Sequence, residues 1–265
     1  VGTRQGGGPV EIGEESRKLF LEETGTGVPA RRISTAFPTR HPVRFLAARS
    51  SDTTMSSTPL RQRAAWKALG GVPLILEGFV DFVREVSIIG ARSTRGETRC
   101  YPLCGNTHRE GILRVTLAPA TNARLQKAAE RHLRRVMNHF GYAGVLTIEF
   151  FVQRGQLVAN EMAPRVHNSG HWTIEGAVTS QFENHLRAIM GLPLGETRAV
   201  GHCAMVNFIG TLPDRDRVLA LASAHYHDYG KAPRQGRKLG HCTIVARTAA
   251  ERDRTLRRLL RLVQR

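Results

Sequence analysis

The sequence lacks the features of a membrane protein or of a disulfide-stapled domain. None of its apolar runs approaches the roughly 20 residues that cross a bilayer, and its first residues lack the charged-then-apolar order of a secretion signal. Its 4 cysteines include no C-x-x-C pair, and a chain of 265 residues can fold without disulfides. We therefore expect a cytoplasmic protein with reduced cysteines and no membrane partner.

Lysine is also scarce, although the chain is strongly basic. The formal net charge is +17, yet only Lys18, Lys67, Lys127, Lys231 and Lys238 are lysines. Clustered basic residues bind nucleic acid by releasing counterions from its phosphates, whereas the arginines here are scattered, which suits an acidic small substrate equally well. With 6% aromatic residues, no stacking platform of the kind used by RNA-binding modules is visible. Nucleic acid is therefore disfavoured as a partner.

Regular elements can be assigned mainly from about residue 73 onward. Residues 37–63 carry neither a helical nor a strand period, so the sequence predicts a poorly ordered segment there. The runs LILEGFV and REVSIIGAR are rich in β-forming residues and are separated by a polar corner, which predicts two strands paired with each other.

Three helices are predicted in the remaining chain, and the first of them is amphipathic. The first spans about 122–140 after a cap at Thr121 or Asn122. Its apolar face consists of Leu125, Ala129, Leu133, Val136 and Phe140. The second spans about 180–190, and the third is an arginine-rich helix that follows a capping box at residues 248–251. Short strands and loops are expected between the second and third helices.

A hairpin carries the strongest chemical signal. The runs GVLTIEFFV and QLVANEMA read as strands joined by a tight turn at Arg154-Gly155. Glu149 and Glu161 each lie six residues from Gly155, so they should face one another across the strands, roughly 5 Å apart. Two like charges destabilise a sheet unless a cation neutralises them, and Mg²⁺ prefers carboxylate oxygens. A pair beside Asn160 suits a nucleotide site; a register shifted by one residue would leave two surface glutamates.

A polar loop follows the second strand of this hairpin, at residues 163–171. Binding residues concentrate in loops at strand ends. His167 and His171 have the i, i+4 spacing of a zinc-protease helix, but Pro164 and Gly170 oppose a helix, so that interpretation is weak. The alternative is a plain turn with exposed histidines.

A basic loop near the end of the chain is a second candidate binding segment. Lys231, Arg234, Arg237 and Lys238 place four cations around Gly236. Such cations can cradle a phosphate where a glycine lets the backbone come close. The alternative is a solvated basic loop without a ligand.

Longer segments, taken in order, closely resemble N5-carboxyaminoimidazole ribonucleotide synthetase, also called the ATPase subunit of phosphoribosylaminoimidazole carboxylase. They are LEGFVDFVREVSIIGAR, YPLCGNTHREGILRVT, GYAGVLTIEFF, VANEMAPRVHNSGHWTIEGAVTSQFENHLRAI and GKAPRQGRKLGH. The resemblance runs from about Ala65 to the end, and NEMAPRVHNSGHWT is its most specific part. It implies an α+β ATP-grasp fold with a small β-rich carboxyl-terminal domain, and a carbon–nitrogen ligase of purine biosynthesis.

The resemblance also implies a reaction and a set of roles. ATP would phosphorylate bicarbonate to carboxyphosphate, which would carboxylate the exocyclic amine of 5-aminoimidazole ribonucleotide. Mg²⁺, or Mn²⁺, would bind Glu149 and Glu161. The residues implied for the nucleotide are Glu77 and Val80 at the adenine edge, Glu85 at the ribose hydroxyls, and His108 and Asn160. The residues implied for bicarbonate and carboxyphosphate are Arg165, His167 and Asn168. The residues implied for the ribonucleotide phosphate are Lys231, Arg234, Arg237 and Lys238. The family suggests a homodimer.

Two departures from the family pattern temper these expectations. The family begins with a Rossmann-like domain, which we expect to be largely missing. Where the family has a glycine-rich loop over the phosphates, this chain reads RSSDTTMSSTPLRQR. We therefore expect nucleotide binding to be better preserved than carboxylation. The expected division is 1–36 leading into the ATP-grasp region, 37–76 a partial middle lobe, 77–195 the catalytic lobe, and 196–265 the carboxyl-terminal domain.

Three other functions remain as alternatives. One is another ATP-grasp ribonucleotide enzyme, such as the formate-dependent glycinamide ribonucleotide transformylase, which HNSGHWT and GRKLGH fit less well. A second is a truncated, inactive remnant that only binds nucleotide or other chains. An RNA-binding module is the most distant.

Overall fold

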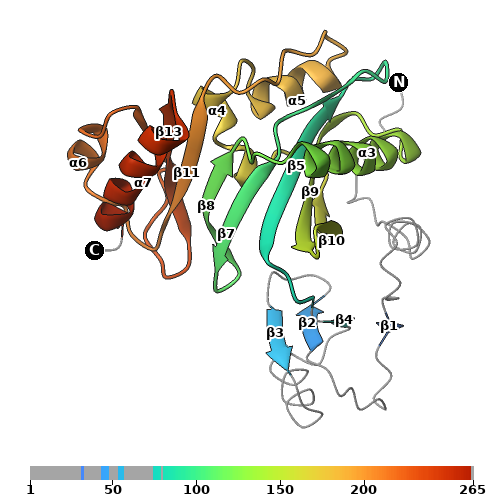
Figure 1. The fold of residues 1–265 in the computed structure, drawn as a ribbon, viewed down its shortest axis with the longest axis horizontal. Coiled ribbons are helices and arrows are strands. Elements are labelled where there is room, and N and C mark those ends of the chain that lie inside the picture. Colours follow the sequence, from blue (N-terminus) through green and yellow to red (C-terminus); the bar gives the residue numbers. More distant parts are fainter. Residues whose placement is uncertain (1–30, 33–42, 48–52, 57–73, 79, 264–265) are drawn as a thin grey trace, which may run out of the picture. The chain divides into compact units, whose positions relative to one another are not determined.

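The computed structural model describes residues 31–32, 43–47, 53–56, 74–78 and 80–263 (Figure 1). The chain divides into two compact units, Val1–Val80 and Asp81–Arg265. The first unit contains an antiparallel sheet with the strand order β1-β4-β2-β3. Its strands are β1 Arg31–Arg32, β2 Val43–Ala47, β3 Thr53–Ser56 and β4 Leu74–Gly78.

The first unit contains strands that the sequence analysis does not predict. The segment 37–63, for which no regular element is predicted, contains β2 and β3, which pair with each other. β2 also pairs with β4. The prediction of poor order for the rest of that segment lies outside the described residues.

The second unit is built on a nine-stranded sheet with the order β10-β9-β5-β7-β8-β11-β13-β12, and β6 pairs with β5. Every pairing recorded in it is antiparallel. Its first strands are β5 Arg84–Arg92, β6 Thr98–Cys100, β7 Cys104–Arg109, β8 Ile112–Ala118 and β9 Gly144–Gln153. The later strands are β10 Gln156–Ala163, β11 His202–Ile209, β12 Ala224–Asp228 and β13 Lys238–Ala246.

The prediction that LILEGFV and REVSIIGAR pair with each other is wrong. The first run forms β4, which pairs with β1 and β2. The second run forms β5, which has β9 along one edge and β6 and β7 along the other. A strand has only two edges, so β5 has no free edge for β4.

Helices cover both faces of the sheet around β5 and β9 (Figure 1). α3 Ala123–His139 and α5 Gln181–Ile189 lie against these two strands. The 3₁₀ turn η1 Asn168–Gly170 lies near β8, α4 Thr173–Gly176 lies against β13, α6 Arg215–Leu219 against β12, and α7 Ala249–Val263 against β11 and β13. α3 lies against one face, where Gly90 leaves room for Leu133. On the opposite face, Gly170 approaches Ile89. The described residues thus form an α+β fold, as predicted.

The three predicted helices are present, with small changes at their faces. The side chain of Asn122, rather than that of Thr121, caps α3 by accepting a hydrogen bond from the Leu125 N–H. Met137 completes the buried stripe of α3, whereas Phe140 is 43% exposed because it lies beyond the last turn. The capping box of α7 forms both of its reciprocal hydrogen bonds.

The interior of the second unit includes two distinct apolar clusters. One contains Trp172 and Tyr101, whose rings meet edge to face at 6.5 Å. The other lies between α7 and the β11–β13 part of the sheet and contains Phe208 and Leu259. All four cysteines are free thiols, as predicted. Within the described residues, no helix has the length and apolarity to cross a membrane.

The cap of α3 gives a stability test. We expect Asn122→Ala to lower the free energy of unfolding of the second unit by about 1 kcal/mol, because it leaves a helix N–H without its acceptor. The exposed neighbour provides the control, since Thr121→Ala should change this free energy by less than about 0.5 kcal/mol. Urea unfolding followed by Trp172 fluorescence, in a Trp66→Phe background, would measure both. A larger loss of unfolding free energy in Thr121→Ala than in Asn122→Ala would place the cap at Thr121 instead.

Candidate active site around two paired glutamates

The β9–β10 hairpin places Glu149 and Glu161 directly opposite one another. The turn residues Arg154 and Gly155 have φ values of 49° and 74°, as a two-residue type I′ turn requires. Regular pairing from this turn joins Ala159 to Phe150 and would bring Asn160 opposite Glu149. The register instead shifts between Ala159 and Glu161, so that Glu161 pairs with Glu149. The predicted pairing is therefore confirmed, but it depends on a β-bulge that the sequence count does not include.

The two carboxylates occupy different environments. Glu149 is only 7% exposed, whereas Glu161 is exposed. Burial, and then the charge of Glu161, raise the pKa of Glu149 to about 7. Carboxylate and imidazole atoms of Glu149, Glu161 and His167 lie within 4.8 Å of one another. A cation between the carboxylates would remove the repulsion that holds this pKa high.

His108 connects a third carboxylate to this pair. Its Nδ1 lies 2.8 Å from Glu85 Oε2, and its Nε2 lies 4.0 Å from Glu149 Oε2. Burial lowers the pKa of His108, but the hydrogen bond and charge of Glu85 outweigh it and leave this pKa above its ordinary value. Glu85 and His108 are thus brought to the carboxylate site, and their contact with a nucleotide stays a prediction.

The loop after β10 is held by the first residue of α5. The Gln181 side chain accepts a hydrogen bond from the His167 N–H at 3.0 Å and donates one to the His167 carbonyl at 2.7 Å. Gly170 is required beside it, because a Cβ there would come within 2.5 Å of Gln181 Oε1 and 2.8 Å of Ile89 Cδ1. The loop is therefore fixed in place and is not a plain turn with exposed histidines.

His167 points to the carboxylate pair. Its Nε2 lies 3.2 Å from Glu149 Oε1, and it is 8% exposed. Burial, and then the positive charge of Arg165, lower the pKa of His167 to about 3. The imidazole is therefore neutral near pH 7. Arg165 is exposed, and among the described residues its side chain donates one hydrogen bond, to the Val166 carbonyl at 3.0 Å. Other guanidinium N–H groups can therefore bind an anion.

The Asn168 amide is engaged in a reciprocal pair with Asn207 of β11. Asn168 donates to Asn207 Oδ1 at 3.0 Å, and Asn207 donates to Asn168 Oδ1 at 2.6 Å. Asn168 Nδ2 also lies 3.2 Å from His171 Nδ1. Asn207 further donates to the Leu113 carbonyl. Both amide hydrogens of Asn168 are thus used inside the protein.

A neutral histidine–tyrosine chain extends from this point toward the basic loop. The Tyr229 hydroxyl lies 3.0 Å from His171 Nδ1 and 2.9 Å from His241 Nδ1. Burial lowers the pKa of His171 to about 4 and that of His241 to about 2. The His241 ring also stacks on His227, which is held 2.6 Å from Glu175.

The four cations of the predicted phosphate site do not share one environment. Lys238 begins β13 and is half-buried; burial lowers its pKa, while the charges of Glu149 and Glu161 act in the opposite direction. Lys231 and Arg234 are exposed, with the Lys231 ammonium 5.1 Å from the Tyr229 ring centroid. Arg237 donates to the Ala232 carbonyl. Lys238 therefore interacts with the carboxylates, whereas the other three cations lie in the loop that precedes it.

Two implied nucleotide residues lie in the first unit. Glu77 is in β4 and Val80 ends the unit. Their contact with adenine stays a prediction, as does the role of Asn160, the bulged residue of β10.

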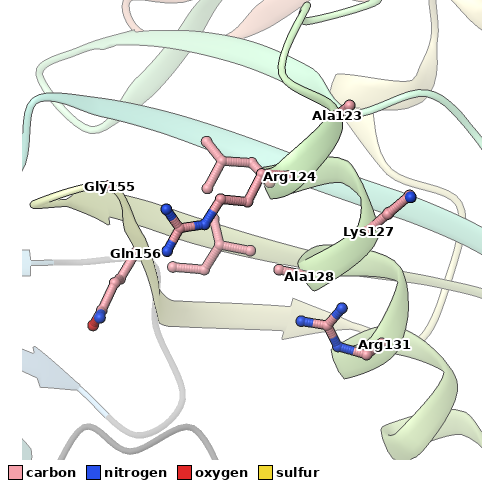
Figure 2. A pocket seen from close by; sticks show the side chains of 9 residues that line it. Ala123, Arg124, Lys127, Ala128, Arg131, Gly155 and Gln156 are labelled. Carbon is pink, nitrogen blue, oxygen red and sulfur yellow. The ribbon is translucent and has the colours of Figure 1, made fainter.

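A hollow of about 500 Å³ lies away from these carboxylates, against α3, which covers the opposite face of the sheet. Figure 2 shows Arg124 and Arg131 extending from α3 toward the hairpin that carries Gly155 and Gln156. Because its lining contains cations and no carboxylate, this hollow does not suit a metal ion.

Several residues that organise the site carry no signal in the sequence. Gln181, Asn207 and Tyr229 look like ordinary helix or strand residues until the fold brings them to the loop. Ser87 and Asn106 are likewise buried polar residues of β5 and β7. A polar residue inside an otherwise apolar strand run, as at Ser87 in REVSIIGAR, is the one available hint.

Comparisons with known proteins agree with this geometry. Residues 52–182 match the ATP-grasp domain family, and residues 203–255 match the phosphoribosylaminoimidazole carboxylase C-terminal domain family. The chain is 55% identical over 186 residues to the N5-carboxyaminoimidazole ribonucleotide synthase of Pseudomonas aeruginosa, covering 70% of this chain and 51% of that protein. It is 45% identical over 190 residues to the Escherichia coli synthase, covering 71% of this chain and 53% of that protein. The chain thus spans about half the length of these curated relatives.

Solved structures resemble the whole described fold. The N5-carboxyaminoimidazole ribonucleotide synthetase of Thermus thermophilus superposes with a TM-score of 0.84 at 45% identity, over 95% of this chain and 72% of that one. The Aspergillus clavatus synthase in complex with ADP and 5-aminoimidazole ribonucleotide gives a TM-score of 0.83 at 28% identity, over 95% of this chain and 73% of that one.

The raised pKa of Glu149 predicts a pH-dependent ion site. A cation must displace the proton that Glu149 holds below about pH 7, so Mg²⁺ affinity should rise up to about tenfold per pH unit below that value and level off above it. Without an ion, the sign is opposite: the unfolded chain loses this proton near 4.5 and the folded chain near 7, so stability should fall as pH rises through that window.

Calorimetric Mg²⁺ titrations in buffers of different protonation enthalpy would measure the released proton. Glu161→Gln is the informative comparison. It leaves the burial of Glu149 unchanged but removes the charge that adds most to it in raising the pKa of Glu149, so it should shift the pH dependence to lower pH while weakening binding. A pH-independent affinity between about pH 6 and 8 would contradict the assignment.

Proposed function

We propose that this chain, which belongs to the N5-carboxyaminoimidazole ribonucleotide synthase family, acts in a carboxylation. The reaction would consume ATP and bicarbonate and would carboxylate 5-aminoimidazole ribonucleotide. The observation that carries the proposal is the Glu149–Glu161 pair, held in register by a bulge and surrounded by His108, His167 and Lys238. A cytoplasmic location is proposed with it.

The paired carboxylates fit a magnesium ion with substrate phosphates. Glu149 and Glu161 would hold the ion, which when bound supplies charge neutralisation for phosphates. Mn²⁺ takes the same oxygen ligands. The protein's own contribution is geometric: the β9–β10 pairing fixes both carboxylates before any ligand arrives, so little reorganisation is needed.

The residues proposed for the nucleotide are those that the resemblance implies. Glu77 and Val80 would meet the adenine edge. Glu85 would accept from the ribose hydroxyls with the oxygen that His108 does not occupy, since His108 is recorded on Oε2 alone. Asn160 would lie beside the carboxylate pair.

The loop after β10 is proposed to hold bicarbonate and carboxyphosphate. Arg165 offers an exposed guanidinium to an anion, and neutral His167 lies against the buried carboxylate. Asn168 would contribute by positioning, because its amide hydrogens are directed to Asn207 and His171. Excluding water from this loop matters because carboxyphosphate is hydrolysed when exposed.

The basic loop is proposed to bind the ribonucleotide phosphate. Lys231, Arg234 and Arg237 supply mostly exposed cations, and Lys238 joins them to the carboxylate site. Gly236, with φ of 72°, allows the turn between them.

A homodimer is proposed as the assembly. α5 exposes an apolar stripe at Phe182, Leu186, Ile189 and Met190, with exposed fractions of 36%, 56%, 48% and 68%. Such a contiguous apolar face is typical of a protein–protein interface. Leu186→Lys should therefore convert a dimer to a monomer in light scattering, whereas Arg187→Lys on the same helix should not; a monomeric parent chain would refute the dimer.

The activity test separates chemistry from folding. Because nucleotide binding is expected to be better preserved than carboxylation, we expect measurable binding of Mg²⁺-ATP together with ADP release near background. We expect Glu161→Gln to weaken this binding, because one of two ion ligands is lost, and any ADP release to depend on both bicarbonate and 5-aminoimidazole ribonucleotide. Glu97→Gln, at a 44% exposed side chain paired with Arg99, is the matched control and should leave the binding unchanged. ADP release independent of the ribonucleotide would contradict carboxylation, and no release at all would favour a chain that only binds nucleotide.

A further inference from the structure

A chain of buried polar side chains crosses three strands and ends at the back of His167. It consists of Thr116 on β8, Asn106 on β7, Ser87 on β5 and Ser169 in η1, and we refer to these four residues as the relay. Three of them are completely buried and Asn106 is 8% exposed. Fully satisfied buried networks of this kind specify one arrangement, because any misdirected group would be left unpaired.

The backbone sets the direction of the relay at His167. The Ser169 N–H lies 3.3 Å from His167 Nδ1 and can only donate, so Nδ1 must be the unprotonated nitrogen. In a neutral imidazole the proton is then on Nε2, which lies 3.2 Å from Glu149 Oε1. His167 therefore donates to Glu149 from Nε2.

That assignment determines the direction of each remaining hydrogen bond in the relay in turn. The Ser169 hydroxyl, 2.9 Å from the same Nδ1, must also donate to it. Its oxygen then accepts from the Ser87 hydroxyl at 2.9 Å, and Ser87 accepts from Asn106 Nδ2 at 3.0 Å. Thr116 completes the relay by donating to Asn106 Oδ1 at 3.1 Å. Reversing any one bond would set two donors or two acceptors against each other.

We infer that the relay holds His167 as a fixed Nε2–H donor to Glu149, so that a divalent ion at this cluster is bound by Glu149 and Glu161 without a nitrogen ligand from His167. Glu149, Glu161 and His167 lie close enough to bind one ion together. Distance alone therefore does not distinguish an ion bound by all three side chains from an ion bound by the two glutamates. The relay separates them, because the Nε2 lone pair that a metal would need is occupied by a proton. Ser169, Ser87 and Asn106 are accordingly positioning residues. The ion itself rests on the proposed function; the orientation of His167 does not.

The His167 ring can be observed directly in the chain without ion or nucleotide. Nitrogen–proton correlation spectra of the imidazole rings distinguish the two neutral tautomers, and the signals absent from His167→Gln identify the ring. We expect a protonated Nε2 and a bare, hydrogen-bonded Nδ1. A protonated Nδ1, or a doubly protonated ring at pH 7, would overturn the inference.

Serine variants test the relay itself. Ser169→Ala removes one of the two donors to Nδ1 and should shift its nitrogen resonance toward that of a nitrogen without a hydrogen bond. Ser87→Ala, one step further away, should cause a smaller shift. Ser93→Ala is the matched control, since Ser93 is 3% exposed and its hydroxyl has no partner among the described residues. An unchanged His167 spectrum in Ser169→Ala would refute the positioning role.

Mn²⁺ provides a readout of the ligand set that does not require turnover. Pulsed electron paramagnetic resonance should detect no directly bound nitrogen, and His167→Gln, which keeps an N–H donor, should weaken Mn²⁺ binding by less than about tenfold. A nitrogen coupling that disappears in His167→Gln would overturn the inference. If Mn²⁺ does not bind at all, the proposed magnesium role fails, while the ring spectrum still decides the orientation of His167.

Discussion

The site depends on two carboxylates that are held in register against their own repulsion. An antiparallel pairing with like charges opposite one another is unfavourable, and the bulge between Ala159 and Glu161 is what creates it. Without the bulge, Asn160 would oppose Glu149, and Glu161 would turn to the other face of the sheet. Bulges recur next to active sites because they re-aim a side chain while the flanking strands stay regular. One extra residue thus converts an ordinary hairpin into one that sets two carboxylates opposite each other.

The groups around Glu149 and Glu161 reduce the electrostatic cost of placing the two carboxylates opposite one another, without neutralising them completely. Glu149 receives a neutral donor from His167 and faces His108 and Lys238, whose charges oppose that of Glu161. The histidines deeper in the protein, His171 and His241, are neutral because burial lowers their pKa. Positive charge is therefore supplied beside the carboxylates by Lys238 and His108, whereas His171 and His241 form uncharged hydrogen bonds. Such an arrangement costs less than burying ion pairs that lack full compensation.

Turn and capping residues in the sequence were sufficient to predict much of the β9–β10 hairpin and the positions of the helices. Arg154-Gly155 supplies the positive φ values of its turn, and Asn122 and Thr248 cap their helices. The bulge could not be read, because Val158 to Ala163 contains neither the glycine nor the proline that often marks one. Counting six residues in each direction from Gly155 gave the right pairing because two errors cancel. The turn is centred between Arg154 and Gly155 and not on Gly155, and the bulge adds one residue to β10. Glu149 and Glu161 were therefore predicted correctly for an incomplete reason.

Longer-range partners were outside the reach of sequence periodicity. REVSIIGAR reads as a strand, but its partners β9, β6 and β7 come from later in the chain, so the prediction of the neighbouring run as its partner failed. Gln181 and Asn207 matter only because the fold brings an α5 residue and a β11 residue to the same loop. Roles set by tertiary contacts leave little trace in local composition.

The continuity of the sheet explains how the carboxylate site and the basic loop can act together. β8 pairs with β11, and β11 with β13, so backbone hydrogen bonds run unbroken from the glutamate hairpin to Lys238. The Asn168–Asn207 pair and the Tyr229 hydroxyl add side-chain links along the same path. A hinge between these parts would have to break strand pairing, which a flexible linker between separate domains would not require. Glu149, Glu161 and Lys238 are therefore set at a fixed separation by the fold, whereas Lys231 and Arg234 lie in an exposed loop.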